Sequence, residues 1–213
     1  MMEENRIRRN RVLGQKIIKE LESRNMEGYY AESGEEALKL ALDMIPEGSS
    51  ISWGGSVSIK EIGLQQAVCQ GNYKIYDRDA TNTPEERRQV MIDAYGCDYF
   101  ITSTNAITST GELVNVDGMA NRVSAIAFGP KNVLMIVGMN KVVKNVEDAI
   151  SRTRNEAAPV NAQRFGIDTP CVKTGVCFDC KSPDTICCQT LITRYSKIKG
   201  RIKIILVNED LGF

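Results

Sequence analysis

Blocks of apolar residues at helical spacing alternate along the chain with short apolar runs that are typical of strands. Ile7, Leu13, Ile17 and Leu21 recur at roughly three- and four-residue spacing between charged residues, which predicts an amphipathic helix over residues 3–27. Short runs with β-branched and aromatic residues predict strands. We expect strands at 29–32, 50–53, 74–76, 98–104, 122–128, 132–137 and 201–207.

Capping and turn residues predict the remaining element boundaries. Ser33 and Glu36 have the spacing of a capping box, which predicts the start of a helix. Thr83 followed by Pro84 predicts the start of another, because proline suits the first helical position. We expect these helices over 33–45 and 83–95, further helical segments from 58 and over 141–154, 159–165 and 189–195, and a hairpin over 106–117.

The alternation of strands and helices predicts an α/β fold. We expect a mostly parallel sheet, and the hairpin around Gly111 adds a small antiparallel part. Neither an internal repeat nor a low-complexity tract divides the chain. We therefore expect a single α/β domain over residues 1–213, with a cysteine-rich loop at 168–194.

Composition and charge narrow the classes of function. The formal net charge of the 213 residues is zero, which argues against a nucleic-acid partner or an anionic membrane surface. No apolar run is long enough to span a bilayer, and the N-terminus lacks the apolar region of a secretory signal. We expect a cytoplasmic protein. In a reducing cytosol, clustered cysteines are ligands or redox groups more often than disulfides.

Five of the seven cysteines lie within eighteen positions near the C-terminus. The chain has no histidine, so thiolates are the expected ligands of any metal there. An iron–sulfur cluster, a structural zinc ion, and metal-free thiols or a redox disulfide all fit this spacing. Cys177 and Cys180 form a two-residue-spaced pair, Cys171 is a natural third ligand, and Cys187 or Cys188 is the fourth.

Glycine, hydroxyl and cationic residues follow several predicted strands. In an α/β sheet such strand-end loops converge on one edge, where ligands bind. Backbone N–H groups and hydroxyls there suit a phosphate or a carboxylate. Alternatively, Asn121 and Arg122 fix a turn, and Lys131 is an exposed residue after Pro130. The candidate pocket residues are Gly54, Gly55, Ser56, Ser58, Thr104, Asn105, Thr110, Gly111, Glu112, Asn121, Arg122 and Lys131.

Ordered motifs along most of the chain resemble the lactate-utilization (LUD) domain family, in its small stand-alone form. The motifs are Trp53-Gly54-Gly55-Ser56-Val57-Ser58, the run from Ser103 to Leu113, Asp117-Gly118, Asn121-Arg122 and Phe128-Gly129-Pro130-Lys131. The resemblance implies a fold like that of ribose-phosphate isomerases and CoA transferases. The catalytic glutamate of CoA transferases has no secure counterpart in this chain, although Glu112 lies near the corresponding region.

The resemblance also implies a role and partners. Relatives in lactate catabolism belong to multi-subunit oxidation systems, some with iron–sulfur centres, so an iron–sulfur cluster is favoured over zinc. We expect an accessory or electron-transfer component that works with other subunits of such a system. We also expect it to bind a small anionic ligand, and a homo-oligomer is one option for its assembly. The alternatives are a transferase-like or isomerase-like enzyme for a phosphorylated or CoA-linked ligand with a structural metal, and a ligand sensor without catalysis.

Overall fold

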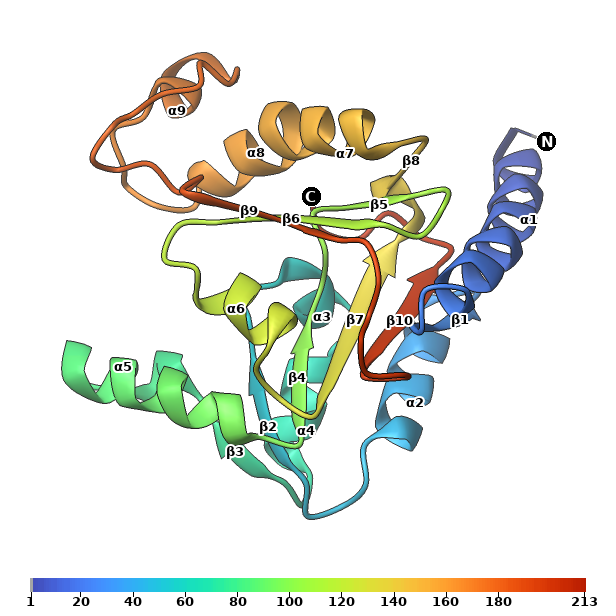
Figure 1. The fold of residues 1–213 in the computed structure, drawn as a ribbon, viewed down its shortest axis with the longest axis horizontal. Coiled ribbons are helices and arrows are strands. Elements are labelled where there is room, and N and C mark those ends of the chain that lie inside the picture. The colour runs from blue at the N-terminus through green and yellow to red at the C-terminus, as the bar shows by residue number, and fades with distance from the viewer. Residues whose placement is uncertain (1) are drawn as a thin grey trace.

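A six-stranded parallel sheet forms the centre of the protein (Figure 1). The computed structural model describes residues 2–213, and the strand order is β1-β10-β7-β4-β2-β3, with every neighbouring pair parallel. The predicted α/β class with a mostly parallel sheet is confirmed. The strands are β1 (Glu27–Ala31), β2 (Ser50–Trp53), β3 (Lys74–Tyr76), β4 (Tyr99–Thr102), β7 (Asn132–Gly138) and β10 (Ile202–Val207).

Both faces of this sheet are buried by helices. Along β7, Leu134 and Ile136 face one core cluster, whereas Val133, Met135 and Val137 face the other, as the two-residue period of a strand requires. The first cluster packs against α2 (Gly34–Met44), α3 (Val57–Glu61) and α4 (Leu64–Gln70). The second packs against α1 (Met2–Glu22) and α6 (Asn121–Ala127).

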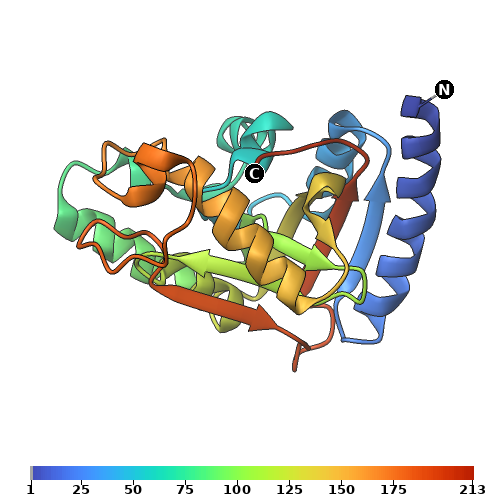
Figure 2. The same ribbon diagram turned by 90° about the horizontal axis from the view of Figure 1, so that it is seen from above.

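A smaller mixed sheet lies across the carboxyl ends of the central strands (Figures 1 and 2). Its order is β8-β5-β6-β9, and the β5–β6 hairpin is antiparallel, as predicted, with Gly111 at a φ of 88° in its turn. Ala106 and Val114 of this sheet pack against Ala149 above them. The strands are β5 (Ala106–Thr108), β6 (Leu113–Asp117), β8 (Val142–Val143) and β9 (Gln189–Thr193).

A long interrupted helix covers the small sheet. It comprises α7 (Val146–Arg152), the π-helical turn η4 (Thr153–Ala157) and α8 (Ala158–Ala162). Pro159 has no N–H to donate and crowds the carbonyl four residues earlier, which accounts for the widened turn before it. The expected helices over 141–154 and 159–165 are thus one helix that starts later, at the Asn145 cap.

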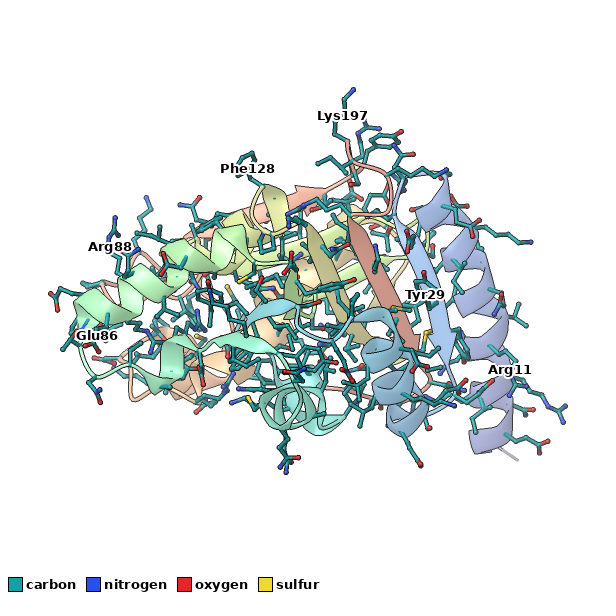
Figure 3. All side chains as sticks on the ribbon, turned by 90° about the horizontal axis from the view of Figure 1, so that it is seen from below. Arg11, Tyr29, Glu86, Arg88, Phe128 and Lys197 are labelled. Atoms are coloured by element: carbon teal, nitrogen blue, oxygen red, sulfur yellow. The ribbon has the colours of Figure 1, made fainter. Side chains whose placement is uncertain are left out.

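Two sequence predictions were wrong. Residues 122–128 were expected as a strand, but 122–127 belong to α6 and Phe128 is its C-cap. The Asp117 carboxylate accepts the N–H groups of Arg122 and Val123 at 2.9 and 3.0 Å and starts a helix there. Residues 189–195, expected as helical turns, contain β9, which pairs antiparallel with β6. Phe128 projects into solvent at the end of α6 (Figure 3).

The other elements agree with the capping signals. Ser33 accepts the N–H of Glu36 at the start of α2, and Thr83 accepts the N–H of Glu86 at the start of α5. Glu86 itself and Arg88 lie on the outer surface of α5 (Figure 3). Over residues 2–213, no helix combines the length and the apolar character needed to cross a bilayer. The remaining elements are α5 (Pro84–Asp93), α9 (Pro170–Thr174), η1 (Arg78–Ala80), η2 (Ala94–Gly96) and η3 (Met139–Lys141).

Candidate functional site

A cavity of about 450 Å³ opens at the carboxyl ends of β2 and β4. This is the edge where α/β sheets bind ligands, because the loops after adjacent strands converge there. Its walls carry six cationic and two acidic side chains, although the formal net charge of the whole chain is zero. The charged lining residues are Lys60, Arg78, Arg87, Arg122, Lys141 and Arg164, with Asp79 and Asp117.

The Gly54-Gly55-Ser56 turn forms the floor beside β2. A Cβ on Gly54 would lie 2.8 Å from Cδ of Arg122, so a glycine is required for the close approach of that side chain. A Cβ on Gly55 would meet only the terminal Nη2 of Arg78, at 3.3 Å. Ser56 caps α3 by accepting the N–H of Ile59. The two glycines therefore leave room for Arg122 and Arg78 to lie close to the turn.

Arg122 is held by neutral oxygen atoms. Its guanidinium donates to Oδ1 of Asn115 at 2.6 Å, to Oδ1 of Asn105 at 2.9 Å, and to the carbonyls of Val116 at 2.6 Å and Ser103 at 3.3 Å. No carboxylate lies within 4 Å of it in the described part of the chain. Burial lowers the pKa of Arg122, and the nearby Asp117 carboxylate opposes that shift. An anion in the cavity would be attracted to this fixed charge.

Arg78 and Arg87 approach from the segment after β3. Nε of Arg78 is buried without a hydrogen-bond partner and lies 3.7 Å from the Asp79 carboxylate, which Arg87 also contacts at 3.0 Å. Burial lowers the pKa of Arg78. One carboxylate therefore serves two guanidinium groups, and an excess of positive charge faces the cavity.

Lys141, which follows β7, is 3% exposed. Its Nζ donates to Oγ of Ser58 at 2.8 Å and to Oγ of Ser103 at 3.0 Å. Burial lowers the pKa of Lys141 to about 7, with a further contribution from the charges of Arg152 and Arg122. A lysine with this pKa is partly neutral at physiological pH, which is typical of functional lysines.

Aromatic side chains close one side of the cavity. The Arg164 guanidinium lies 5.7 Å from the ring centre of Phe165 and 5.9 Å from that of Phe213. The segment before Phe213 crosses over α3, where the N–H of Gly212 donates to the Glu61 carboxylate at 2.6 Å. A cationic group between two rings suits recognition of a planar or anionic ligand.

The structure brings together most of the predicted pocket residues. Ser58 lies beneath the cavity as a partner of Lys141. Those that line the cavity are Gly54, Gly55, Ser56, Thr104, Asn105, Asn121 and Arg122.

Four predicted pocket residues lie elsewhere. Thr110, Gly111 and Glu112 belong to the β5–β6 hairpin, where the Glu112 carboxylate pairs with Arg24 and accepts the Thr110 hydroxyl at 2.8 Å. Lys131 lies at the amino edge of the sheet, 74% exposed and paired with Asp98 at 2.9 Å. The charges of Glu112 and Lys131 are paired with other residues away from the cavity, and none of the four residues lines it.

The predicted cysteine-rich loop borders the cavity through Ile186. Ile186 lines the cavity, and a Cβ on Gly118 would lie 3.3 Å from its Cα. The N–H of Cys188 donates to the Asp117 carbonyl at 2.9 Å, which ties the loop to β6. The two candidate sites of the sequence are therefore adjacent.

The five thiols of the loop influence one another electrostatically. Burial raises the pKa of the Cys187 thiol to about 11, and the other four cysteines of the loop, Cys171, Cys177, Cys180 and Cys188, add to the shift. No disulfide links them, and within residues 2–213 no three cysteine or acidic side chains already converge as metal ligands would. In chemistry the thiols suit a thiolate-ligated centre, and ligation would require them to draw closer together.

Several residues that line the cavity were not predicted from the sequence. Lys141 stands three residues after the end of β7, a strand-end position that pointed to the ligand edge, yet its segment was predicted to be helical. Arg78, Arg87 and Arg164 lie on segments whose approach to the cavity depends on tertiary packing. No local pattern signals such an approach.

Comparison with known proteins identifies the family. A model of the LUD domain matches residues 14–207. The fold is similar to that of a DUF162 family protein from Deinococcus radiodurans, with a TM-score of 0.53 and 11% sequence identity over 93% of this chain and 98% of that chain. No curated protein matches the sequence. Because the family model spans nearly the whole chain, the protein belongs to the LUD domain family and is thereby related to lactate utilization.

Proposed function

We propose that the protein is an iron–sulfur accessory or electron-transfer component in the oxidation of lactate or a related organic acid. The supporting observation is the adjacency of two features: a cation-lined cavity, and a loop with five cysteines that borders it through Ile186. A small carboxylate in the cavity would lie beside the thiol loop. Other subunits of the oxidation system would supply or receive the electrons.

The cysteines that would hold the cluster are Cys171, Cys177, Cys180 and either Cys187 or Cys188. When bound, such a cluster accepts and passes on single electrons. The loop has few other restraints: its ion pairs, Lys173 with Asp168 and Arg154 with Asp179, are largely exposed. Ligation would therefore stabilise the loop as well as serve redox chemistry.

Anaerobic purification followed by iron and acid-labile sulfide analysis tests the proposal. We expect brown protein with stoichiometric iron and sulfide, and loss of both in the Cys177→Ser and Cys180→Ser variants. Cys69→Ser is the matched control, because Cys69 is exposed on α4 and separate from the loop. Colourless protein with stoichiometric zinc would contradict the iron–sulfur assignment.

A second candidate is an enzyme for a phosphorylated or CoA-linked ligand, with zinc in the cysteine loop. The excess of cationic side chains and the cavity volume of about 450 Å³ favour this reading, because ligand pockets of that size hold small molecules. Saturable binding of sugar phosphates or CoA esters in calorimetry, with turnover, would support it. Tight binding without turnover would instead support a sensor.

The Arg78→Met variant tests the anion site under either candidate. We expect its affinity for the bound anion to fall on the order of ten-fold or more, because a charge-assisted contact in a partly buried site contributes roughly 1.5–3 kcal/mol. Arg88→Met is the control, since Arg88 is exposed on α5 (Figure 3) and absent from the cavity lining. Equal affinities of the two variants would argue against the cavity as the binding site.

A further inference from the structure

Lys141 has a setting that binding of an anion does not by itself explain. It is buried, it lines the cavity, and it forms no ion pair within 4 Å with a described carboxylate. The exposed Lys60 also lines the cavity and would suffice to attract an anion. A buried lysine costs folding free energy, so the position calls for a role that needs an amine.

The contacts of Nζ match a neutral amine. A neutral amine has two N–H groups and one lone pair, and two hydroxyl oxygens, those of Ser58 and Ser103, lie at 2.8 and 3.0 Å. Both serine hydroxyls have acceptors of their own, the carbonyls of Leu211 and Thr104. The serines thus accept both N–H groups, and the lone pair remains for reaction.

The surrounding charges favour the neutral form. Arg152 of α7 and Arg122 of α6 repel a proton on Lys141, and Glu61 of α3 is the carboxylate that opposes them. Burial acts in the same direction as the arginines and is the largest cause of the lowered pKa. The amine is consequently nucleophilic at a pH where exposed lysines are protonated.

We propose that Lys141 forms a Schiff base with an aldehyde or ketone that carries a carboxylate or phosphate. Its nitrogen attacks the carbonyl carbon, a C–N bond forms, and the carbonyl oxygen leaves as water with the two amine protons, so the step needs no oxidant or reductant. Arg78 contacts the anionic group and the fixed charge of Arg122 attracts it, which means that this inference rests on the proposed binding of a small anion in the cavity.

Reductive trapping of the full-length protein tests the inference. The protein is incubated with pyruvate or with ribose 5-phosphate, reduced with sodium cyanoborohydride, digested, and mapped by mass spectrometry. At pH 7.5 we expect one of the probes to label Lys141 on the order of ten-fold or more above any exposed lysine, because an exposed lysine has a pKa of about 10.4 and is almost fully protonated. Which probe labels Lys141 distinguishes a 2-oxo acid from a sugar phosphate.

The Lys141→Arg variant should lose the adduct, whereas Lys144→Arg, at an exposed position, should keep it. Peptide mapping of the unsubstituted protein decides the question even where Lys141→Arg does not fold. Calorimetric binding of a probe without an adduct at Lys141 would overturn the inference and leave the anion site standing. Absence of both binding and adduct would overturn the anion site as well.

Discussion

At the scale of single residues, Lys141 carries a cost that predicts a measurable pH dependence. Its pKa is lowered to about 7 in the folded protein, so the unfolded chain binds its proton more tightly. Stability therefore rises with pH from about 7 to the ordinary lysine pKa of about 10.4, and this gain is absent below pH 7. At pH 7 and below, the folded protein therefore bears the cost of a buried charge at this position in the cavity.

The Lys141→Met variant should be more stable than the unsubstituted protein at pH 6, by roughly 1–3 kcal/mol, because methionine fills a similar volume without a buried charge. Ser58 and Ser103 keep their own acceptors in the variant. Urea denaturation at pH 6 and pH 9 measures the effect, which should shrink at the higher pH. A variant that is less stable at pH 6, with an unchanged pH profile, would contradict the assigned burial cost.

The paired glycines after β2 make a second prediction at this scale. Gly54→Ala should destabilise the protein by about 1–3 kcal/mol, because its Cβ would displace Arg122, and should weaken anion binding. Gly55→Ala is the matched control for stability: its Cβ meets only the terminal Nη2 of Arg78, at 3.3 Å, so its free energy of unfolding should change little. Thermal denaturation with calorimetric binding measures both. Similar losses in the two variants would contradict the proposed packing.

At the scale of elements, the cysteine-rich loop should depend on a bound metal for its order. We expect removal of the metal, by chelation or oxidation, to open residues 175–188 to proteolysis while the central sheet stays protected, because the loop's other restraints are largely exposed. Limited proteolysis with mass spectrometry locates the cuts. Identical cleavage before and after metal removal would show that the loop stays ordered without a bound metal.

Elements with local signals were predictable from sequence, and elements decided by distant partners were not. Ser33 and Thr83 cap their helices through bonds to residues three positions on, which the sequence displays directly. By contrast, α6 begins where it does because Asp117 caps it, and β9 is a strand because the edge of β6 accepts it. Short apolar segments of this kind suit either helix or strand until the tertiary partner is known.

The same distinction holds for the cavity. Gly54 and Asn105 follow strands, and the rule that strand-end loops converge placed them correctly. Glu112 and Lys131 were expected beside them but pair with Arg24 and Asp98, contacts between segments far apart in sequence. Lys141 could be found only once β7 was seen to end at the cavity.

At the scale of the whole molecule, a chain of zero net charge concentrates cations in one cavity, and the cysteine-rich loop borders that cavity through Ile186. The likeness to ribose-phosphate isomerases and CoA transferases stays a prediction, and so does the link to partner subunits. The central claim is that cavity and thiol loop act as one site. If so, a ligand in the cavity should alter the spectrum of a centre in the loop.

An optical titration of anaerobically purified protein with lactate and pyruvate tests this claim most directly. The account predicts a visible iron–sulfur absorbance that changes saturably with one of these acids, with the change weakened on the order of ten-fold or more by Arg78→Met and retained by Arg88→Met. Two results would contradict the claim that the two features form one site. One is a visible cluster whose spectrum does not change when the acid binds, and the other is a protein that binds the acid but has no cluster.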